Sequence, residues 1–326
     1  MDNPQENELP QPLKDYLKEA VRRSGYPLQT IVAAELLKNF TVTEEWGYQD
    51  RTTQEHRTLD IFAFKNLAPE NKSGLLVASS IALLMECKRS QHPFIFFKSE
   101  TEQSRPLSGF PRICGVQRVE FHQGTTSREV APSACLGLET ERFSIDVPPI
   151  CTSLARVGGK PEESRQHRRD SRGHDSGGEP IGKGIVLTGS DAYNSILLPL
   201  ISSLDFLAGY FPVSTHQLHP TISLAVCILD APMVLSEGGP EDVALSMVPW
   251  ARLIRRERKK LQHGYHHAQH VVDFVHRYAL NAFVNEVLGF ATIVRERFIE
   301  KAVVFQRGHG VVNDLNNWVW SEVQPK

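Results

Sequence analysis

Two short apolar runs carry charged residues where an ordinary buried strand would carry none. The first run, residues 57–64, contains Asp60 among apolar neighbours, and the second, residues 81–88, ends on Glu86 and Lys88. Side chains at positions i and i+2 of a strand project from the same face, so Glu86 and Lys88 are expected to point together. If the two strands are neighbours in a sheet, Asp60 joins them.

The residues in front of these runs predict two helices and a hairpin. Apolar positions at helical spacing indicate one helix from about residue 13 to 21 and a second from about 28 to 39. Residues 40–48 and 56–64 have the pattern of paired strands, and the polar residues 49–55 form the turn between them.

The second half of the chain again shows clear periodicity. Ser190 is a suitable N-cap for an amphipathic helix, which Pro199 is expected to kink, and residues 222–229 predict a strongly apolar strand. We expect further strands at 233–236 and 245–254. These strands would extend the sheet. A long helical region is predicted from about residue 267 to 304, with Gly289 as a possible break.

The pattern predicts one domain with an insertion. Within residues 93–185 we expect a strand at 94–97, and after it the hydrophobic pattern is no longer regular. Residues 157–183 are rich in Gly, Arg and Ser, which is typical of a flexible loop. Together these features divide the chain into a disordered segment at 1–11 and a single domain at 12–326, with core segments 25–92 and 186–304 and the insertion 93–185.

Three charges that converge in an apolar sheet are costly unless they pair with one another or with a metal ion. Asp60 and Glu86 offer the hard oxygen ligands that Mg²⁺ prefers, and Mn²⁺ takes the same ligands. Such an ion can lower the pKa of a bound water and orient a phosphate, and Lys88 would position or activate the water or offset phosphate charge.

Asp60, followed by Glu86-Cys87-Lys88 at the end of an apolar strand, resembles the PD-(D/E)xK nuclease superfamily of restriction-endonuclease-like proteins. Leu59 stands where the motif has proline. The resemblance covers roughly residues 20–90, and beyond them only the order of elements. It implies an α/β or α+β fold with a central mixed sheet flanked by helices, and hydrolysis of nucleic acid with Asp60 and Glu86 as metal ligands.

The resemblance also implies a role for Glu35, because a glutamate on the first core helix often adds to the metal site in this family. Glu35 lies within the predicted apolar stripe of the second helix, four residues after Ile31. The alternative is an ordinary glutamate at the helix edge, paired with Lys38 or Arg22.

Basic residues are candidates for nucleic-acid binding, since phosphate contacts supply most non-specific affinity. The densest basic stretch is residues 252–260, which can equally be a charged strand end and loop. The candidate contacts are Arg57, Arg89, Arg252, Arg255 and Arg256.

Histidines gather between His263 and His276, and pairs such as His266 and His270 have the i,i+4 spacing of transition-metal ligands on a helix. A surface helix start that is rich in histidine is the simpler interpretation. A histidine-rich metallohydrolase is a third functional reading.

Composition sets limits on partners and location. The chain has 326 residues, 40% of them hydrophobic, and a net charge of −2, so attraction to DNA must come from local patches. No apolar run approaches the ~18 residues of a membrane span. The five cysteines lack paired spacing, which favours free thiols in a cytoplasmic protein.

The sequence therefore predicts a cytoplasmic, Mg²⁺-dependent nuclease with nucleic acid, and DNA in particular, as its partner. A homodimer would favour cleavage of both strands. The alternative is the same fold as a catalytically inactive module that binds nucleic acid or protein.

Overall fold

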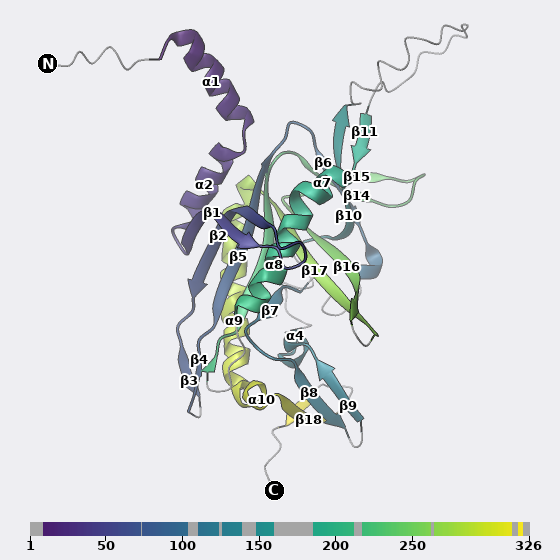
Figure 1. Ribbon diagram of the computed structural model, residues 1–326. Coiled ribbons are helices and arrows are strands. Elements are labelled where there is room, and N and C mark those ends of the chain that lie inside the picture. The colour runs from purple at the N-terminus through teal and green to yellow at the C-terminus, as the bar shows by residue number, and fades with distance from the viewer. Residues whose placement is uncertain are drawn as a thin grey trace, which may run out of the picture.

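A central mixed sheet of twelve strands organises this α/β protein (Figure 1). The computed structural model describes residues 9–72, 74–103, 110–123, 126–138, 148–159, 185–211, 217–261, 264–314 and 319–321. In spatial order the main path of the sheet is β1 (Thr41–Gln49), β2 (His56–Asn66), β5 (Ser80–Arg89), β13 (Thr221–Asp230), β17 (Gly264–His276), β16 (Trp250–Leu261), β10 (Ile150–Gly159), β6 (Phe94–Lys98), β14 (Met233–Glu237) and β15 (Ala244–Met247). Two further strands join it at the side, β11 (Ile185–Thr188) on β10 and β7 (Arg112–Cys114) on β13.

The middle of this sheet is parallel and the β1–β2 end is antiparallel. β1 and β2 form the predicted hairpin, β2 runs antiparallel to β5, and β13 runs parallel to both β5 and β17. β5 and β13 are continuous apolar runs, as expected for central parallel strands that are covered on both faces. The predicted hairpin, third strand and strongly apolar strand are confirmed.

Helices cover both faces of the sheet. α8 (Leu198–Tyr210) crosses one face and α9 (Leu280–Glu300) the other (Figure 1). The two faces bury separate apolar clusters, one packed on α8 and the other on α9 and α2 (Tyr26–Leu36). The helical elements are α1 (Gln11–Arg23), α2 (Tyr26–Leu36), α3 (Glu100–Gln103), α4 (Pro132–Cys135), α7 (Ser190–Ala192), the π-helical turn η2 (Tyr193–Leu197), α8 (Leu198–Tyr210), the 3₁₀ turn η3 (Arg277–Ala279), α9 (Leu280–Glu300) and α10 (Ala302–Arg307).

The helix predicted from Ser190 is present, and its irregular turn lies just before Pro199. Pro199 lies inside the continuous helical run Ser190–Tyr210, directly after the π-helical turn η2 and the first residue of α8. Proline has no N–H to donate to the preceding turn, and a local π-helical turn is one way in which a helix accommodates it. By length and mean hydropathy the run Ser190–Tyr210 is apolar enough to cross a membrane, which corrects the expectation that no such run exists. In the structure its apolar residues pack on the central sheet.

Two smaller sheets flank the central one. One has the order β12 (Gln217–Leu218), β4 (Leu75–Val77) and β3 (Glu70–Lys72). The other has the order β19 (Val319–Ser321), β18 (His309–Asp314), β8 (Val119–Gln123) and β9 (Thr126–Val130).

The long helix predicted from residue 267 to 304 is wrong in its first part. Residues 264–276 are strand β17, which pairs with β16 and β13, and the helix α9 begins at Leu280. α9 continues through Gly289 without a break. The histidines of this segment therefore lie on a strand, where residues i and i+4 are about 13 Å apart and do not meet as they would on a helix.

The segment 93–185 contributes to the central sheet instead of standing outside it. The strands β6, β7, β10 and β11 all include residues from this segment or lie directly at its end. Residues 157–159, expected in a flexible loop, belong to β10. Residues 160–183 of that loop lie outside the described residues, as do residues 1–8 of the segment 1–11 that was expected to be disordered. At the end of that segment, Gln11 is the first residue of α1.

The five cysteines are free, as their spacing predicted, and all five are buried.

Candidate active site

The alternation of side chains between the two faces of the sheet breaks at Asp60 of β2. Leu59 packs on the α8 side of the sheet, whereas Ile61 packs on the α2 and α9 side, although residues two apart share a face in a regular strand. β2 pairs with β5 from Asn66, which lies opposite Ser80, to Ile61, which lies opposite Met85. Asp60 therefore stands just past the last pair, and its side chain is available for other contacts.

The carboxylate of Asp60 takes the place of a ladder hydrogen bond. The backbone N–H of Cys87 donates to its Oδ2 at 2.6 Å. This bond ties the end of β2 to the residue between Glu86 and Lys88. The fold therefore holds the three charged residues together through the backbone as well as through their side chains.

Lys88 lies between the two carboxylates. Its Nζ donates to Glu86 Oε2 at 2.5 Å and lies 3.7 Å from Asp60 Oδ2. The side chain of Glu86 is 5% exposed, and those of Asp60 and Lys88 are 26% and 32% exposed. One end of the cluster is thus closed in the sheet, while the other is open to a ligand.

The electrostatics of the cluster follow from this burial. Desolvation raises the pKa of Glu86 to about 7, which Lys88 partly offsets and Asp60 reinforces. Burial alone would lower the pKa of Lys88, but the charges of Glu86 and Asp60 outweigh burial and raise it. Lys88 is therefore protonated at neutral pH in this metal-free cluster.

A buried glutamine braces Asp60 from the other side. Gln29 of α2 donates from Nε2 to the carbonyl oxygen of Asp60 at 3.0 Å and to Glu45 Oε1 at 3.1 Å. Glu45 has a φ of 50°, a strained backbone conformation for a residue with a side chain, and its position on β1 falls opposite Asp60. This contact was missed by sequence reasoning, although Gln29 is a polar residue next to the apolar stripe of the predicted second helix.

Glu35 adopts the simpler of its two predicted arrangements. Lys38 Nζ donates to both of its carboxylate oxygens, at 2.8 and 2.7 Å. Ile31, which was expected in the buried stripe, is 59% exposed. The helix is therefore turned differently from the prediction, and Glu35 lies at the helix edge.

Arg57 and Arg89, two predicted nucleic-acid contacts, belong to strands that reach the candidate site. Arg57 Nε lies 2.9 Å from Asp50 Oδ2, and Arg89 Nε lies 3.3 Å from Asp230 Oδ2. Arg89 also donates to the backbone carbonyl of Arg22, which links β5 to the end of α1.

The predicted role of Arg252 in nucleic-acid binding is wrong, because its side chain is fully buried. It forms an ion pair with Asp273 on the neighbouring strand. Arg255 and Arg256 lie nearer the surface of β16, where Arg255 packs over the ring of Tyr193 and Arg256 pairs with Glu102.

The histidine cluster does not form the predicted helical metal site. His270 is buried on β17 with Nε2 3.7 Å from Glu257 Oε2, and His276 accepts a hydrogen bond from the backbone N–H of Tyr278. His263 lies outside the described residues, as do the side chains of His266 and His267.

Within the described residues, no group of three or more His, Cys, Asp or Glu side chains is placed to hold a metal ion. Asp60 and Glu86 offer two carboxylates. Two carboxylates nevertheless fit Mg²⁺, which usually keeps several waters and binds proteins through one or two carboxylates together with substrate phosphates. The donor set is therefore compatible with Mg²⁺ and less suited to an ion that needs a full protein cage.

Comparisons with protein-family models, with curated protein sequences and with solved structures found no significant match.

Proposed function

We propose that this protein is a metal-dependent nuclease that hydrolyses phosphodiester bonds, with DNA as its substrate. The observation that carries the proposal is the convergence of Asp60, Glu86 and Lys88, in which one ammonium group lies 2.5 and 3.7 Å from two carboxylates. The resemblance of these residues to the PD-(D/E)xK motif adds to it.

The roles of the three residues follow from their exposure and charge. Asp60 and Glu86 would hold Mg²⁺ at the open end of the cluster. Bound Mg²⁺ would lower the pKa of a coordinated water and offset charge on the phosphate. In hydrolysis the water oxygen forms a new bond to phosphorus, the bond to the leaving oxygen breaks, and a proton ends on that oxygen. Lys88, which is protonated in the metal-free cluster, would stabilise the negative charge that develops on the phosphate.

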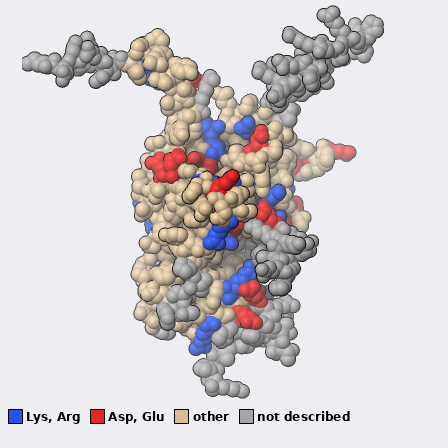
Figure 2. Space-filling view, in the orientation of Figure 1, with Lys and Arg blue, Asp and Glu red and all other residues tan. Residues whose placement is uncertain are grey.

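Binding of the substrate would rely on local basic groups. Figure 2 shows Lys and Arg in several separate patches on the viewed face, with acidic residues beside them, and the net charge of the chain is −2. Arg57 and Arg89 are the arginines of β2 and β5, the two strands of the site, and we propose that they contact phosphates. Such contacts position the strand and carry no sequence information directly.

The proposal is tested by incubating the protein with plasmid DNA and Mg²⁺. Wild-type protein is expected to cleave, and Asp60→Asn and Lys88→Gln are expected to lose at least 100-fold in rate, because each removes a group that binds the metal or the charged phosphate. Lys98→Gln is the matched control, since Lys98 also forms an ion pair with a glutamate, Glu237, at 2.7 Å on the same sheet. Full cleavage by the Asp60 and Lys88 variants would show that the site is assigned wrongly.

The second candidate function is an inactive binding module, which is favoured by the two-carboxylate donor set and by the internal ion pairs of Lys88. Calorimetric titration with Mg²⁺ or Mn²⁺ separates the two candidates. A nuclease site should bind the ion in wild-type protein and lose it in Asp60→Asn, whereas a vestigial site should bind poorly in both.

A further inference from the structure

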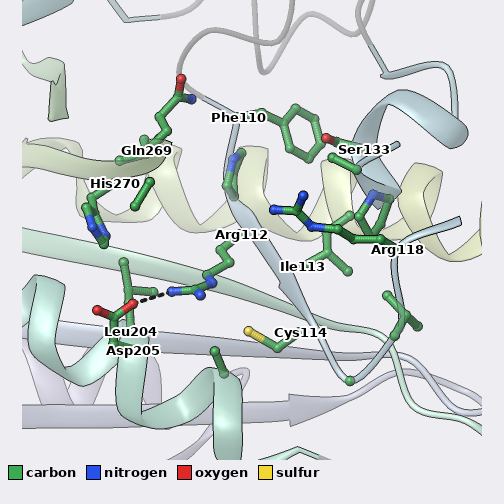
Figure 3. A pocket seen from close by; sticks show the side chains of 18 of the residues that line it. Phe110, Arg112, Ile113, Cys114, Arg118, Ser133, Leu204, Asp205, Gln269 and His270 are labelled. Atoms are coloured by element: carbon green, nitrogen blue, oxygen red, sulfur yellow. Dashed lines mark hydrogen bonds and ion pairs between the residues drawn. The ribbon is translucent and has the colours of Figure 1, made fainter. Parts of the chain in front are cut away.

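A second site lies away from the carboxylates, in a pocket of about 580 Å³ between β7, α4, α8 and the middle of β17 (Figure 3). This volume is in the range of pockets that hold small molecules. Arg112, which lines the pocket, pairs with Ser223 of β13, whereas Glu86 pairs with Cys227 of the same strand. Four residues of strand correspond to about 13 Å, so the pocket is separate from the metal site.

The pocket has two aromatic side chains in its wall, each fixed by a neighbour. The ring of Phe110 packs edge-on against Phe290 with 5.3 Å between centroids, and the ring of Phe211 stacks on Phe64 at 6.1 Å. Rings that are already held in place can pack on a flat ligand with little loss of side-chain entropy.

The charged lining residues of the pocket are two arginines and one aspartate. Arg112 donates from Nη1 to Asp205 Oδ1 at 2.7 Å, which orients its guanidinium at the pocket wall. Figure 3 shows Arg118 extending from the opposite wall toward the middle of the pocket, between Phe110 and Ile113. The charged lining residues are thus net positive, and an anionic ligand is favoured over a neutral or cationic one.

Arg118 is the better placed of the two arginines to bind an incoming anion. Its ion pair with Glu129 measures 3.2 Å, and both side chains are well exposed, 46% and 61%. Exposed ion pairs of this kind contribute little to stability, so a ligand anion can compete for the guanidinium. Arginine also binds phosphate through two parallel N–H···O bonds, which fixes the orientation of the ligand.

We propose that this pocket binds a nucleoside phosphate, with the base between the aromatic and aliphatic side chains and the phosphate on Arg112 and Arg118. Ser133 and Gln269, which also line the pocket, supply hydrogen-bonding groups for the polar edge of the base or for the sugar. A purely apolar ligand fits less well, because it would desolvate both guanidinium groups without replacing their hydrogen bonds.

The test is calorimetric titration of the full chain with 5′-AMP in EDTA, so that no metal chemistry takes part. Wild-type protein is expected to bind 5′-AMP more tightly than either adenosine or inorganic phosphate alone, because the pocket holds both parts of the ligand. Absence of binding at millimolar 5′-AMP would overturn the proposal. Equal binding of phosphate alone would also overturn it, because the pocket would then be a general anion site.

Variants locate the binding in this pocket. Arg118→Gln and Arg112→Gln are each expected to weaken 5′-AMP binding at least tenfold, and Ala208→Leu is expected to do so by filling space while leaving every charge in place. Lys72→Gln, which removes a cation from the exposed strand β3, should bind like wild-type protein. Thermal unfolding checks that each variant is folded, and if Arg112→Gln is not, the other two decide. Unchanged binding in the folded pocket variants contradicts the assignment.

The ligand can be a free nucleotide or one unit of a nucleic-acid strand, and competition distinguishes them. A short single-stranded oligonucleotide that displaces 5′-AMP in wild-type protein, and binds more weakly to Arg118→Gln, identifies the strand as the source. An oligonucleotide that leaves 5′-AMP binding unchanged identifies the free nucleotide. Asp60→Asn should bind 5′-AMP like wild-type protein, so this proposal can hold or fail independently of the nuclease assignment.

Discussion

At Glu86 burial and charge oppose each other, and burial has the larger effect on the pKa. The side chain ends a run of apolar residues on β5 and is almost fully enclosed, so its ionised form is stabilised mainly by Lys88. The consequence is a carboxyl group with a pKa of about 7. Perturbed groups of this kind concentrate at functional sites, although structural ion pairs produce them as well.

The raised pKa predicts a pH dependence of stability in the absence of metal. The folded protein keeps the proton on Glu86 up to a pKa of about 7, whereas an unfolded chain loses it near the ordinary glutamate pKa of 4.5. The folded state binds more protons between these values, so the free energy of unfolding should fall as pH rises from about 4.5 to 7. The fall expected from this group is on the order of 1–3 kcal/mol.

Urea denaturation in EDTA at a series of pH values measures this effect. Glu86→Gln removes the titrating group, so the difference in unfolding free energy between wild type and variant should change across this window. Lys88 does not titrate there, because its raised pKa lies well above it. Two parallel pH profiles would mean that Glu86 is ionised throughout.

The residues of the candidate site could be predicted from sequence to different degrees. Glu86 and Lys88 follow from the i, i+2 rule on an apolar strand, and the expected neighbourhood with Asp60 agrees with the observed distances. The break in alternation at Asp60 coincides with a positive φ at Glu45 across the sheet and with the hydrogen bonds of Gln29 to both residues, and such contacts between distant segments are not encoded in a local pattern. For Glu35 the sequence left two alternatives open, and it could not choose between them because the predicted stripe included Ile31, which is exposed.

At the scale of elements, β17 shows where periodicity cannot distinguish strand from helix. Val272 and Phe274 pack on the α8 side of the sheet and Val275 packs on the α9 side, so the strand is buried on both faces. Such a run has no alternation of apolar and polar residues, and valines four apart also fit a helix. β-branched and aromatic residues were the signal for a strand.

The pairing of β16 with β17 gives Arg252 a structural role, which leads to a prediction for stability. Arg252 donates from Nε and Nη2 to the two carboxylate oxygens of Asp273, at 2.8 and 3.1 Å, and Trp250 donates to the same carboxylate at 2.9 Å. Arg252→Leu would leave Asp273 charged and buried, so the free energy of unfolding is expected to fall by about 3–5 kcal/mol.

Arg255→Leu is the matched control, because this arginine lies on the same strand with an exposed side chain and should cost no more than about 1 kcal/mol. Urea denaturation of the two variants makes the comparison. If both variants lost equally little unfolding free energy, the result would contradict the buried ion pair and would indicate that Arg252 is exposed.

At the scale of the whole molecule, local patterns predicted the elements near the site better than the arrangement of the sheet. The order helix, hairpin, strand, and later helix, strand, follows from periodicity within short windows. The twelve-stranded sheet instead depends on pairs between distant segments, such as β10 with β16 and β6 with β14. Their registers are set by which buried faces meet, and a single sequence does not show that.

The position of α1 shows how the whole fold decides what an amphipathic pattern means. Both α1 and α2 have apolar residues at helical spacing, but Figure 1 shows α1 projecting from the body while α2 lies against the sheet. Leu13 of α1 is 42% exposed, whereas Leu28 of α2 is 3% exposed. The same substitution, leucine to alanine, can therefore be compared at an exposed and at a buried position.

Leu28→Ala is expected to lower the free energy of unfolding by about 2–5 kcal/mol, because it removes a buried side chain and leaves a cavity. Leu13→Ala should change it by no more than about 0.5 kcal/mol, because alanine is an excellent helix former and little buried area is lost. Urea denaturation with a far-ultraviolet circular dichroism signal measures both. A cost for Leu13→Ala as large as that for Leu28→Ala would show that α1 buries its apolar side in solution, and a dependence of that cost on protein concentration would identify a second copy of the chain as the cover.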